Sequence, residues 1–538
     1  MVPFPRGSLT WSGLTLLFVA AACASSEPEV DPPPSLAVIL VVDQLTPDLL
    51  ERYDELWSGG FRRLFDRGYA FEDTVHDHAV TFTSPGHASP TTGVVPARHG
   101  IVANSWRELR DEEWVSVSSV ADPETELVGG SGAGSSPRNL LVEGLPDWIL
   151  EHHEDARVVS LSGKSTAGVL MAGGTGGDEE GRAHAYWFSD ADRGFVTSTH
   201  YRAELPEWVA GFNEEAALTF AGDGCWESRV PAEHVSRARR DTVDYEADGI
   251  HTHFPHCEAD APYRDVGHFI AQTPALDAAT LALASTAVGE LQLGGGDAPD
   301  YLALALSATD RVGHTFGPYS LEQLDNLMRL DEALGRFFED LDRQVGPDRY
   351  VVALTSDHGV LPLPEYLEER GAYGLRLTSE LDDAMERAAH EVGSDPQMPG
   401  EGGPDRDSVE FRARLADALE EVEWVEAAMP LEVLAGGEPV DSFTALYRRS
   451  FHPERLTSRV AEHGVEVRLR EGTLVRSSGT THGAPYLHDR HVPLLFYSSA
   501  VTPARSGDPA RTVDLAPTVA SILEIPVPAG LDGQDLLP

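Results

Sequence analysis

The sequence predicts an α/β protein with a mainly parallel central sheet that is covered by helices on both faces. Four continuous apolar runs, typical of buried parallel strands, occur at 35–42, 301–309, 350–356 and 492–499. Between them, stretches such as 274–291 and 320–344 carry apolar residues at three- and four-residue spacing, as amphipathic helices do. Strands that alternate with helices in this way predict the layered fold.

Two long segments interrupt this alternation. Segments 175–270 and 360–475 are richer in Gly, Pro, Asp and Glu and have no regular apolar period. We expect both to be insertions that form a cap over the carboxyl ends of the strands, where ligands bind in such sheets. The expected catalytic domain therefore runs from 35 to 538 and includes both insertions.

The first residues are typical of a targeting segment. Arg6 precedes a short apolar stretch, LTLLFVAAA, and small residues lead up to Cys23. Nine apolar residues are too few to span a bilayer as a helix. We expect a signal peptide at 1–23, of the lipoprotein type, followed by a polar, proline-rich tether at 24–34. The mature protein would be periplasmic or on the cell surface, with a lipid on Cys23 as its membrane contact.

The charge balance argues against nucleic acid as a partner. The chain has 88 acidic and 40 basic residues and a formal net charge of -48, whereas nucleic-acid binding needs a basic face. A solubility role accounts for the excess of acid. The two other cysteines, Cys225 and Cys257, could form a disulfide in an oxidising compartment or remain buried thiols.

Metal-ligand residue types follow the predicted strands. Aspartates follow three of the apolar runs, and histidines lie nearby; the six candidate ligands are Asp43, Asp310, His314, Asp357, His358 and His482. Carboxylate and imidazole together suit zinc, and two three-ligand sites with open positions are typical of catalysis. A single aspartate at a strand end is usually a helix cap. The chain has 21 histidines, so some clusters arise by chance. The prediction of a two-metal site therefore depends on aspartates and histidines occurring together after several predicted strands.

The stretch TFTSPGH supplies a candidate nucleophile. Pro85 favours the first turn of a helix, so Thr83 is expected at a helix N-terminus, where N–H groups and the dipole favour an anion. A metal on its hydroxyl would lower the hydroxyl pKa and produce an alkoxide. The alternative is an ordinary helix cap.

Lys164, in VVSLSGKSTAG, is the single lysine of the chain. The stretch superficially looks like the phosphate-binding loop of an ATPase, which requires glycine five residues before the second glycine. Val158 stands there, and a β-branched residue cannot adopt the glycine conformation. This excludes a nucleotide loop and leaves either another role for Lys164 or a mutational accident on a surface loop.

Taken in order, several motifs resemble those of the alkaline phosphatase superfamily. They are VVDQ, TFTSPGH, TTGVVPARHGIVAN, TDRVGHTFGP, TSDHG and GTTHG, together with 185–209 and the tail at 512–533. The resemblance is closest to the phosphate-irrepressible alkaline phosphatases with a threonine nucleophile and extends from about residue 36 to the C-terminus.

The resemblance implies a two-zinc phosphohydrolase. One zinc ion would be held by Asp310, His314 and His482, and the other by Asp43, Asp357, His358 and the Thr83 hydroxyl. Thr83 would attack phosphorus and form a phospho-threonine, which zinc-activated water would then hydrolyse.

The resemblance also assigns the substrate contacts. Asn104 matches the asparagine that hydrogen-bonds a phosphoryl oxygen, and Lys164 matches the lysine of a K-x-R pair that reaches the same group. A lysine there would offset the extra charge of a monoester dianion. The arginine position of the pair holds Thr166, so a bidentate contact is missing. Another arginine could take its place.

The sequence thus predicts an exported, metal-dependent phosphomonoesterase that acts on a phosphorylated small molecule. The first alternative is a phosphodiesterase or nucleotide pyrophosphatase with the same metals. A sulfatase is disfavoured because TSPGH lacks the C/S-x-P-x-R pattern, and a non-catalytic binding lipoprotein is disfavoured because every ligand is present. The sequence predicts neither the natural substrate nor the oligomeric state.

Overall fold

A computed structural model describes residues 1–3, 7, 33–174, 181–246, 251–259, 264–393, 405–436 and 439–537. The chain divides into an N-terminal segment, Met1–Pro32, and a unit that spans Pro33–Pro538. Nearly all of the expected signal peptide and of the expected tether lies outside the described residues, so both stay predictions. No helix in the described part of the chain is both long and apolar enough to cross a membrane.

An eleven-stranded sheet forms the centre of the large unit, in the order β19-β2-β18-β13-β1-β12-β7-β8-β9-β5-β6. In chain order its strands are β1 (Leu36–Val42), β2 (Tyr69–Val75), β5 (Ala121–Val128), β6 (Ala133–Ser135), β7 (Val158–Ser162), β8 (Ala183–Ser189), β9 (Gly194–Ser198), β12 (Asp300–Leu306), β13 (Tyr350–Thr355), β18 (Leu494–Tyr497) and β19 (Ala504–Arg511). The middle strands β13, β1, β12, β7 and β8 are parallel.

The strand β18 differs from expectation. The run at 492–499 does form a buried strand, but it pairs antiparallel with both β13 and β2. An apolar run shows that a strand is buried on both faces, whereas its direction is set by the connections before and after it. The strand on the opposite flank of the parallel strands also reverses direction, because β9 runs antiparallel to β8.

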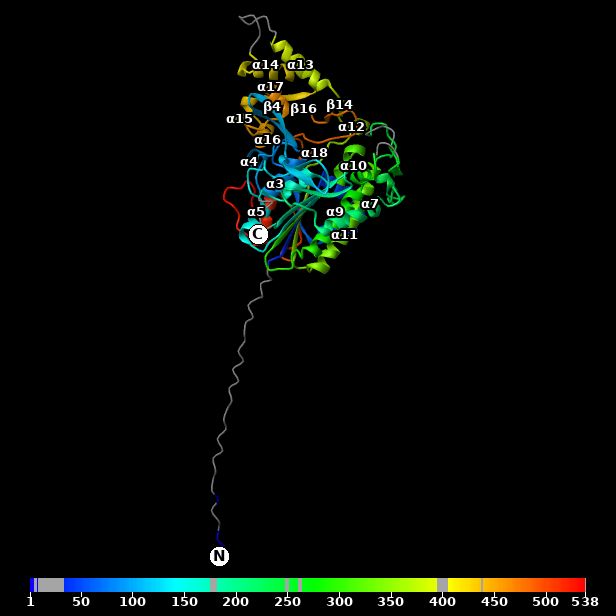
Figure 1. Ribbon diagram of the computed structural model, residues 1–538, viewed down its shortest axis with the longest axis vertical. Helices are drawn as coiled ribbons and strands as arrows, with labels where there is room; N and C mark the ends of the chain where they lie inside the picture. The colour runs from blue at the N-terminus through cyan, green and yellow to red at the C-terminus, as the bar shows by residue number, and fades with distance from the viewer. Residues whose placement is uncertain are drawn as a thin grey trace. The chain divides into compact units, whose positions relative to one another are not determined.

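Helices cover both faces of the sheet, as Figure 1 shows for α9 and α11 on one side and α3 and α5 on the other. One face packs against α1 (Pro47–Arg52), α2 (Gly60–Arg67), α7 (Glu207–Ala221), α8 (Val266–Ala271), α9 (Ala275–Glu290) and α11 (Leu321–Gln344). The opposite face packs against α5 (Leu145–His152), α6 (Ser165–Met171) and α19 (Leu515–Ile522). The two-layer cover confirms the predicted fold class.

Alternation along β1 explains how one strand serves both cores. Leu36, Val38 and Leu40 belong to the first core, while Ala37 and Ile39 belong to the second. All five side chains are fully buried, because successive residues of a strand point to opposite faces. The run at 35–42 is therefore continuously apolar because the strand is buried on both faces, as the sequence predicted.

The first expected insertion, 175–270, is only partly outside the sheet. Strands β8 and β9 belong to the large sheet, β8 parallel to β7 and β9 antiparallel to β8, so the prediction was wrong for 183–198. Downstream, α7 packs on α9, and β10 (Cys225–Trp226) pairs with β11 (His256–Cys257). A disulfide joins Cys225 to Cys257, which decides between the two alternatives for these cysteines.

The second expected insertion, 360–475, contains elements outside the large sheet. They are α12 (Pro364–Glu369), β14 (Leu375–Leu377), α13 (Glu380–Gly393), α14 (Val409–Glu420), β15 (Val425–Pro430), α15 (Leu431–Ala435), α16 (Ser442–Ser450), α17 (Ser458–His463), β16 (Val465–Leu469) and β17 (Thr473–Val475). Helices α13 and α14 and strands β15 and β16 bury a core of their own around Phe411 and Leu415. Ser450 accepts hydrogen bonds from the N–H groups of Ala79 and Val80, in the loop that leads to Thr83.

The remaining described elements are short. They are α3 (Thr83–Thr92), α4 (Pro96–His99), β3 (Ser105–Arg110), β4 (Glu113–Ser118), α10 (Ala308–Phe316), α18 (Leu487–Arg490) and 3-10 segments at Asp54–Leu56, Val235–Arg237 and Thr512–Asp514.

Candidate active site

Three buried carboxylates meet beyond the carboxyl ends of the parallel strands. Asp43 directly follows β1, and Asp357 follows β13, its neighbour in the sheet. Asp310 comes from the third strand, but β12 ends at Leu306 rather than running to residue 309. The residues after Leu306 begin α10, so Asp310 lies in the first turn of a helix. All three side chains are nearly inaccessible to solvent.

Lys164 lies between two of these carboxylates. Its Nζ lies 2.8 Å from Asp43 Oδ2 and 2.5 Å from Asp310 Oδ2. Burial alone would favour the neutral amine, but the charges of Asp310 and Asp43 raise the pKa of Lys164. The lysine is therefore a cation held between the carboxylates of the two predicted metal sites, which excludes a chance surface lysine.

The structure brings together the three residues predicted for the first metal site. Asp310, His314 and His482 each offer one ligand atom, and these atoms lie within 4.8 Å of one another. The Nδ1 atoms of His314 and His482 donate to the carbonyl oxygens of Thr480 and Thr81, at 2.8 Å each. Both Nε2 atoms consequently face Asp310, the arrangement in which a backbone acceptor orients a metal-binding imidazole.

The second group differs from expectation in one member. Asp43 and Asp357 come together with His87, which the sequence reasoning had not selected. His87 Nε2 lies 3.2 Å from Asp43 Oδ1, and its Nδ1 lies 2.8 Å from the carbonyl oxygen of Thr83. Although burial favours the neutral ring, the charge of Asp43 raises the pKa of His87. The available signal was its place in TFTSPGH, one helical turn after Thr83.

His358, the predicted ligand, contacts the same Asp357 carboxylate as His87 does. Its Nε2 is 3.0 Å from Asp357 Oδ2, and its ring stacks on that of His482 at 3.4 Å between centroids. Nδ1 contacts the Gly359 carbonyl oxygen at 2.9 Å, which turns Nε2 toward the carboxylate. His358 remains a predicted ligand, and His87 is a second candidate beside it.

The donor set fits the predicted metals. Buried oxygen and nitrogen atoms that lie in ion-pair contacts but form no hydrogen bond gather here: both carboxylate oxygens of Asp43, Oδ2 of Asp357 and the Nε2 atoms of His87 and His358. Buried polar atoms are rarely left without partners. Carboxylate and imidazole are the ligand types that zinc and similar ions take, so bound cations would satisfy these atoms.

Gln44 orients two of the carboxylates and was not anticipated. Its backbone N–H donates to Asp357 Oδ1 at 3.1 Å, and its side-chain amide donates to Asp310 Oδ1 at 2.8 Å. The residue is fully buried and has a positive φ of 66°. A non-glycine residue in this region is strained by about 1–3 kcal/mol, and such strain is concentrated at functional sites.

The nucleophile candidate begins helix α3, as predicted. Thr83 is its first residue and 4% exposed. Gly86, in the first turn, packs against the backbone of Asp357 so closely that a Cβ would collide with the Asp357 carbonyl oxygen. Glycine at this position thus allows the helix N-terminus to approach the carboxylates of the predicted metal sites.

Asn104 supports the same helix end. Its Oδ1 accepts the backbone N–H of Ser84 at 2.8 Å. This leaves the side-chain N–H bonds of Asn104 without a partner among the described residues, on an exposed side chain. The geometry suits a donor to a phosphoryl oxygen held near Thr83.

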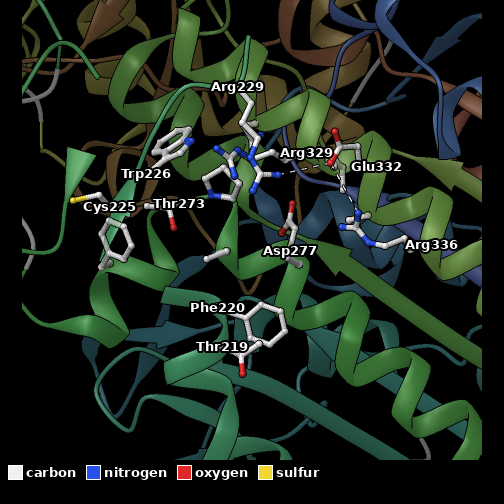
Figure 2. A pocket seen from close by; sticks show the side chains of 17 residues that line it. Thr219, Phe220, Cys225, Trp226, Arg229, Thr273, Asp277, Arg329, Glu332 and Arg336 are labelled. Carbon is white, nitrogen blue, oxygen red and sulfur yellow. Dashed lines mark ion pairs between the residues drawn. The ribbon is translucent and has the colours of Figure 1, made fainter. Parts of the chain in front are cut away.

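Asp277 links the site to a separate cavity of about 210 Å³ (Figure 2). Its Oδ1 accepts the Ala308 N–H at 3.0 Å, at the start of the helix that carries Asp310 and His314. Burial raises the pKa of Asp277 to about 7. Arg329, which lines the same cavity, forms an ion pair with Asp325, with 2.5 Å between Nε and Oδ2. Asp277 therefore anchors α10 from behind.

Fold and site together define a metal-dependent phosphoric ester hydrolase, and comparisons with known proteins agree. Residues 37–470 match the family described as type I phosphodiesterase / nucleotide pyrophosphatase, and the chain belongs to this family. Its curated relatives place it among the alkaline phosphatases of the same superfamily, as the motifs indicated.

The chain is 31% identical to alkaline phosphatase PafA from Elizabethkingia meningoseptica, over 97% of both chains. It is 30% identical to alkaline phosphatase PhoV from Synechococcus elongatus, also over 97% of both. The crystal structure of wild-type PafA superposes with a TM-score of 0.84 at 29% identity, over 94% of this chain and 99% of that one. Mouse ectonucleotide pyrophosphatase / phosphodiesterase 5 shares the fold, with a TM-score of 0.52 at 14% identity, over 94% of this chain and 100% of that one.

Proposed function

We propose that the protein is an exported phosphomonoesterase that uses two zinc ions and a phospho-threonine intermediate on Thr83. The observation that carries the proposal is the position of Lys164. A buried ammonium group between Asp43 and Asp310 adds positive charge at the point where both predicted metal sites meet. A phosphate monoester dianion needs more positive charge than a diester, and the relatives PafA and PhoV are named alkaline phosphatases.

The metals would be held by the residues predicted for them, with His87 as an additional candidate in the second group. Two such ions supply electrostatic stabilisation of the attacking and leaving oxygens. The other contributions come from the chain. The N-terminus of α3 favours the anionic form of Thr83, whose hydroxyl proton passes to solvent. The Thr83 oxygen attacks phosphorus while the bond from phosphorus to the ester oxygen breaks, so that the alcohol leaves and a phospho-threonine remains. Water then attacks this phosphorus, which frees Thr83 and releases inorganic phosphate. Asn104 and Lys164 hold non-bridging oxygens of the phosphoryl group.

A phosphodiesterase is the alternative, and one position favours it. Thr166, half-buried on the first turn of α6, replaces the arginine expected beside Lys164 and adds no charge. The family description also includes phosphodiesterases. A site with less positive charge would discriminate less in favour of the dianionic monoester.

Export and a lipid on Cys23 are proposed from the N-terminal sequence. The disulfide between Cys225 and Cys257 supports export, because structural disulfides are typical of oxidising compartments. A phosphorylated small molecule is the proposed substrate, and the net charge of -48 speaks against nucleic acid.

The test is kcat/KM for a nitrophenyl phosphate monoester against the corresponding diester, with and without a chelator. We expect a preference for the monoester that the chelator abolishes and added zinc restores. A preference for the diester would support the alternative and point to Thr166. Activity that survives complete metal removal would contradict the proposed site.

A further inference from the structure

Arg311 is exceptional among the arginines of this protein. Among the buried and half-buried arginines in the described part of the chain, it is the one whose guanidinium forms neither a hydrogen bond nor an ion pair, and its Nε is buried without a partner. Other half-buried arginines are paired, such as Arg63 with Asp342 and Arg376 with Glu365.

Counter-ions are not scarce in this chain. Acidic residues outnumber basic ones by 88 to 40. A partly buried cation without an ion-pair partner is unfavourable. Because Arg311 lacks such a partner in an acidic protein, we infer that its guanidinium pairs with an anion from outside the chain. The unpaired guanidinium of Arg311 thus indicates a role in ligand binding rather than in stabilising the fold.

Arg311 lies beside the metal-binding carboxylates. It directly follows Asp310 in the first turn of α10, and Asp310 Oδ2 is 2.5 Å from Lys164 Nζ. Arg311 therefore projects from the helix that carries Asp310 and His314, one residue after the carboxylate that Lys164 contacts.

We propose that Arg311 is a second cationic substrate residue, which binds a non-bridging oxygen of a phosphate monoester dianion next to Lys164. This rests on the proposed function and extends it. Two neighbouring cations complement two negative charges on the phosphoryl group, whereas a diester carries one. Arg311 thereby supplies the charge that Thr166 cannot, and it does so from α10 rather than α6.

A second arginine near the site is already engaged. Arg476 donates from Nε to the Ser478 carbonyl oxygen at 2.9 Å, and its Nη1 lies 3.3 Å from His314 Nδ1. It is held against the outer side of a metal ligand, whose Nδ1 is itself turned away from Asp310. Arg311 is the better candidate because its guanidinium has all its donors available.

The test compares wild type with Arg311→Ala and Arg311→Lys, and uses Arg343→Ala as a matched control. Arg343 is exposed on α11 and pairs with Asp340 in the same helix. Each zinc-loaded protein is assayed for kcat/KM on the monoester and diester, for Kd of inorganic phosphate by calorimetry, and for zinc content and Tm. Phosphate binding is a readout that does not require turnover.

For Arg311→Ala we expect about a 100-fold loss of monoester kcat/KM, as for removal of one charged donor, with less than about a 5-fold loss for the diester. Phosphate binding should weaken by a similar factor, Arg311→Lys should recover part of both, and Arg343→Ala should match wild type. Zinc content and Tm should not change.

Equal losses on monoester and diester, or unchanged phosphate affinity, would overturn the role of Arg311 while leaving a functional phosphatase. If wild type preferred diesters, the change in phosphate Kd from wild type to Arg311→Ala would still decide whether Arg311 binds a phosphoryl dianion. If zinc-loaded wild type neither hydrolysed the monoester nor bound phosphate, both this inference and the proposed function would fail.

Discussion

Replacing Lys164 by methionine removes one buried charge and keeps the length of the side chain. The Nζ lies 2.8 and 2.5 Å from the carboxylates of the two predicted metal sites, and the side chain is 15% exposed. A unit charge about 4 Å from another is worth roughly 4 kcal/mol at the effective dielectric constant of about 20 that suits such sites. A monoester dianion has one more such charge than a diester. Allowing for partial solvent screening, we expect a loss of about 2–4 kcal/mol of transition-state stabilisation that is specific to the monoester.

The assay is kcat/KM on a nitrophenyl monoester and diester for wild type and Lys164→Met, with zinc content measured on the same samples. The expected monoester loss is about 30- to 1000-fold, and the diester should lose much less. Lys164→Arg, which keeps the charge with a different shape, should retain part of the monoester activity. Equal losses on both substrates at full zinc occupancy would refute the reasoning and make Lys164 a structural residue that separates Asp43 from Asp310.

Other changes test the remaining parts of the site and the fold. Thr83→Ala should abolish turnover with zinc content intact, and activity near wild type would remove Thr83 as the nucleophile. His482→Ala should lower bound zinc from two ions to one per chain; retention of both would show that another residue completes the site. Burial lowers the pKa of His76 to about 3, while the unfolded chain protonates this ring near 6.5. Stability should therefore fall as pH decreases from 6.5, by about 1.4 kcal/mol per unit. In urea unfolding at pH 7 and 5.5, His76→Asn should show a smaller loss than wild type, and an identical loss would contradict the neutral ring.

The sheet and most of the site could be predicted because they depend on local patterns. Runs such as 35–42 bury both faces of a strand, which leaves the same apolar signal wherever the strand lies in the sheet. The aspartates follow these strands, and parallel strands bring their carboxyl ends to one edge. This is why Asp43 and Asp357 could be placed together from sequence alone.

The parts that were missed depend on contacts between distant segments. The antiparallel direction of β18 is set by the connections before and after it rather than by its own residues. His87 becomes a candidate ligand because α3 packs against Asp357 through Gly86, and nothing in the spacing of TFTSPGH shows that approach. Gln44 orients carboxylates more than 200 positions away along the chain.

The segment 183–198 shows a different limit. Its two strands are short, and their turn residues made them look irregular. Yet β8 pairs with β7 and β9 pairs with β8, which places both strands in the large sheet. Similarly, nothing in the sequence distinguished Arg311 from the other arginines. Its isolation becomes visible only when the partners of every neighbouring carboxylate are known.

The most direct test of the central claim is to trap the phosphoryl group on the enzyme. Zinc-loaded protein would be quenched in acid during monoester turnover, digested, and its peptides analysed by mass spectrometry. The account predicts phosphate on the peptide that contains Thr83, at that residue, and no label in Thr83→Ala. Turnover with no phosphopeptide under quenching fast enough to capture an intermediate, or with phosphate on another residue, would contradict it.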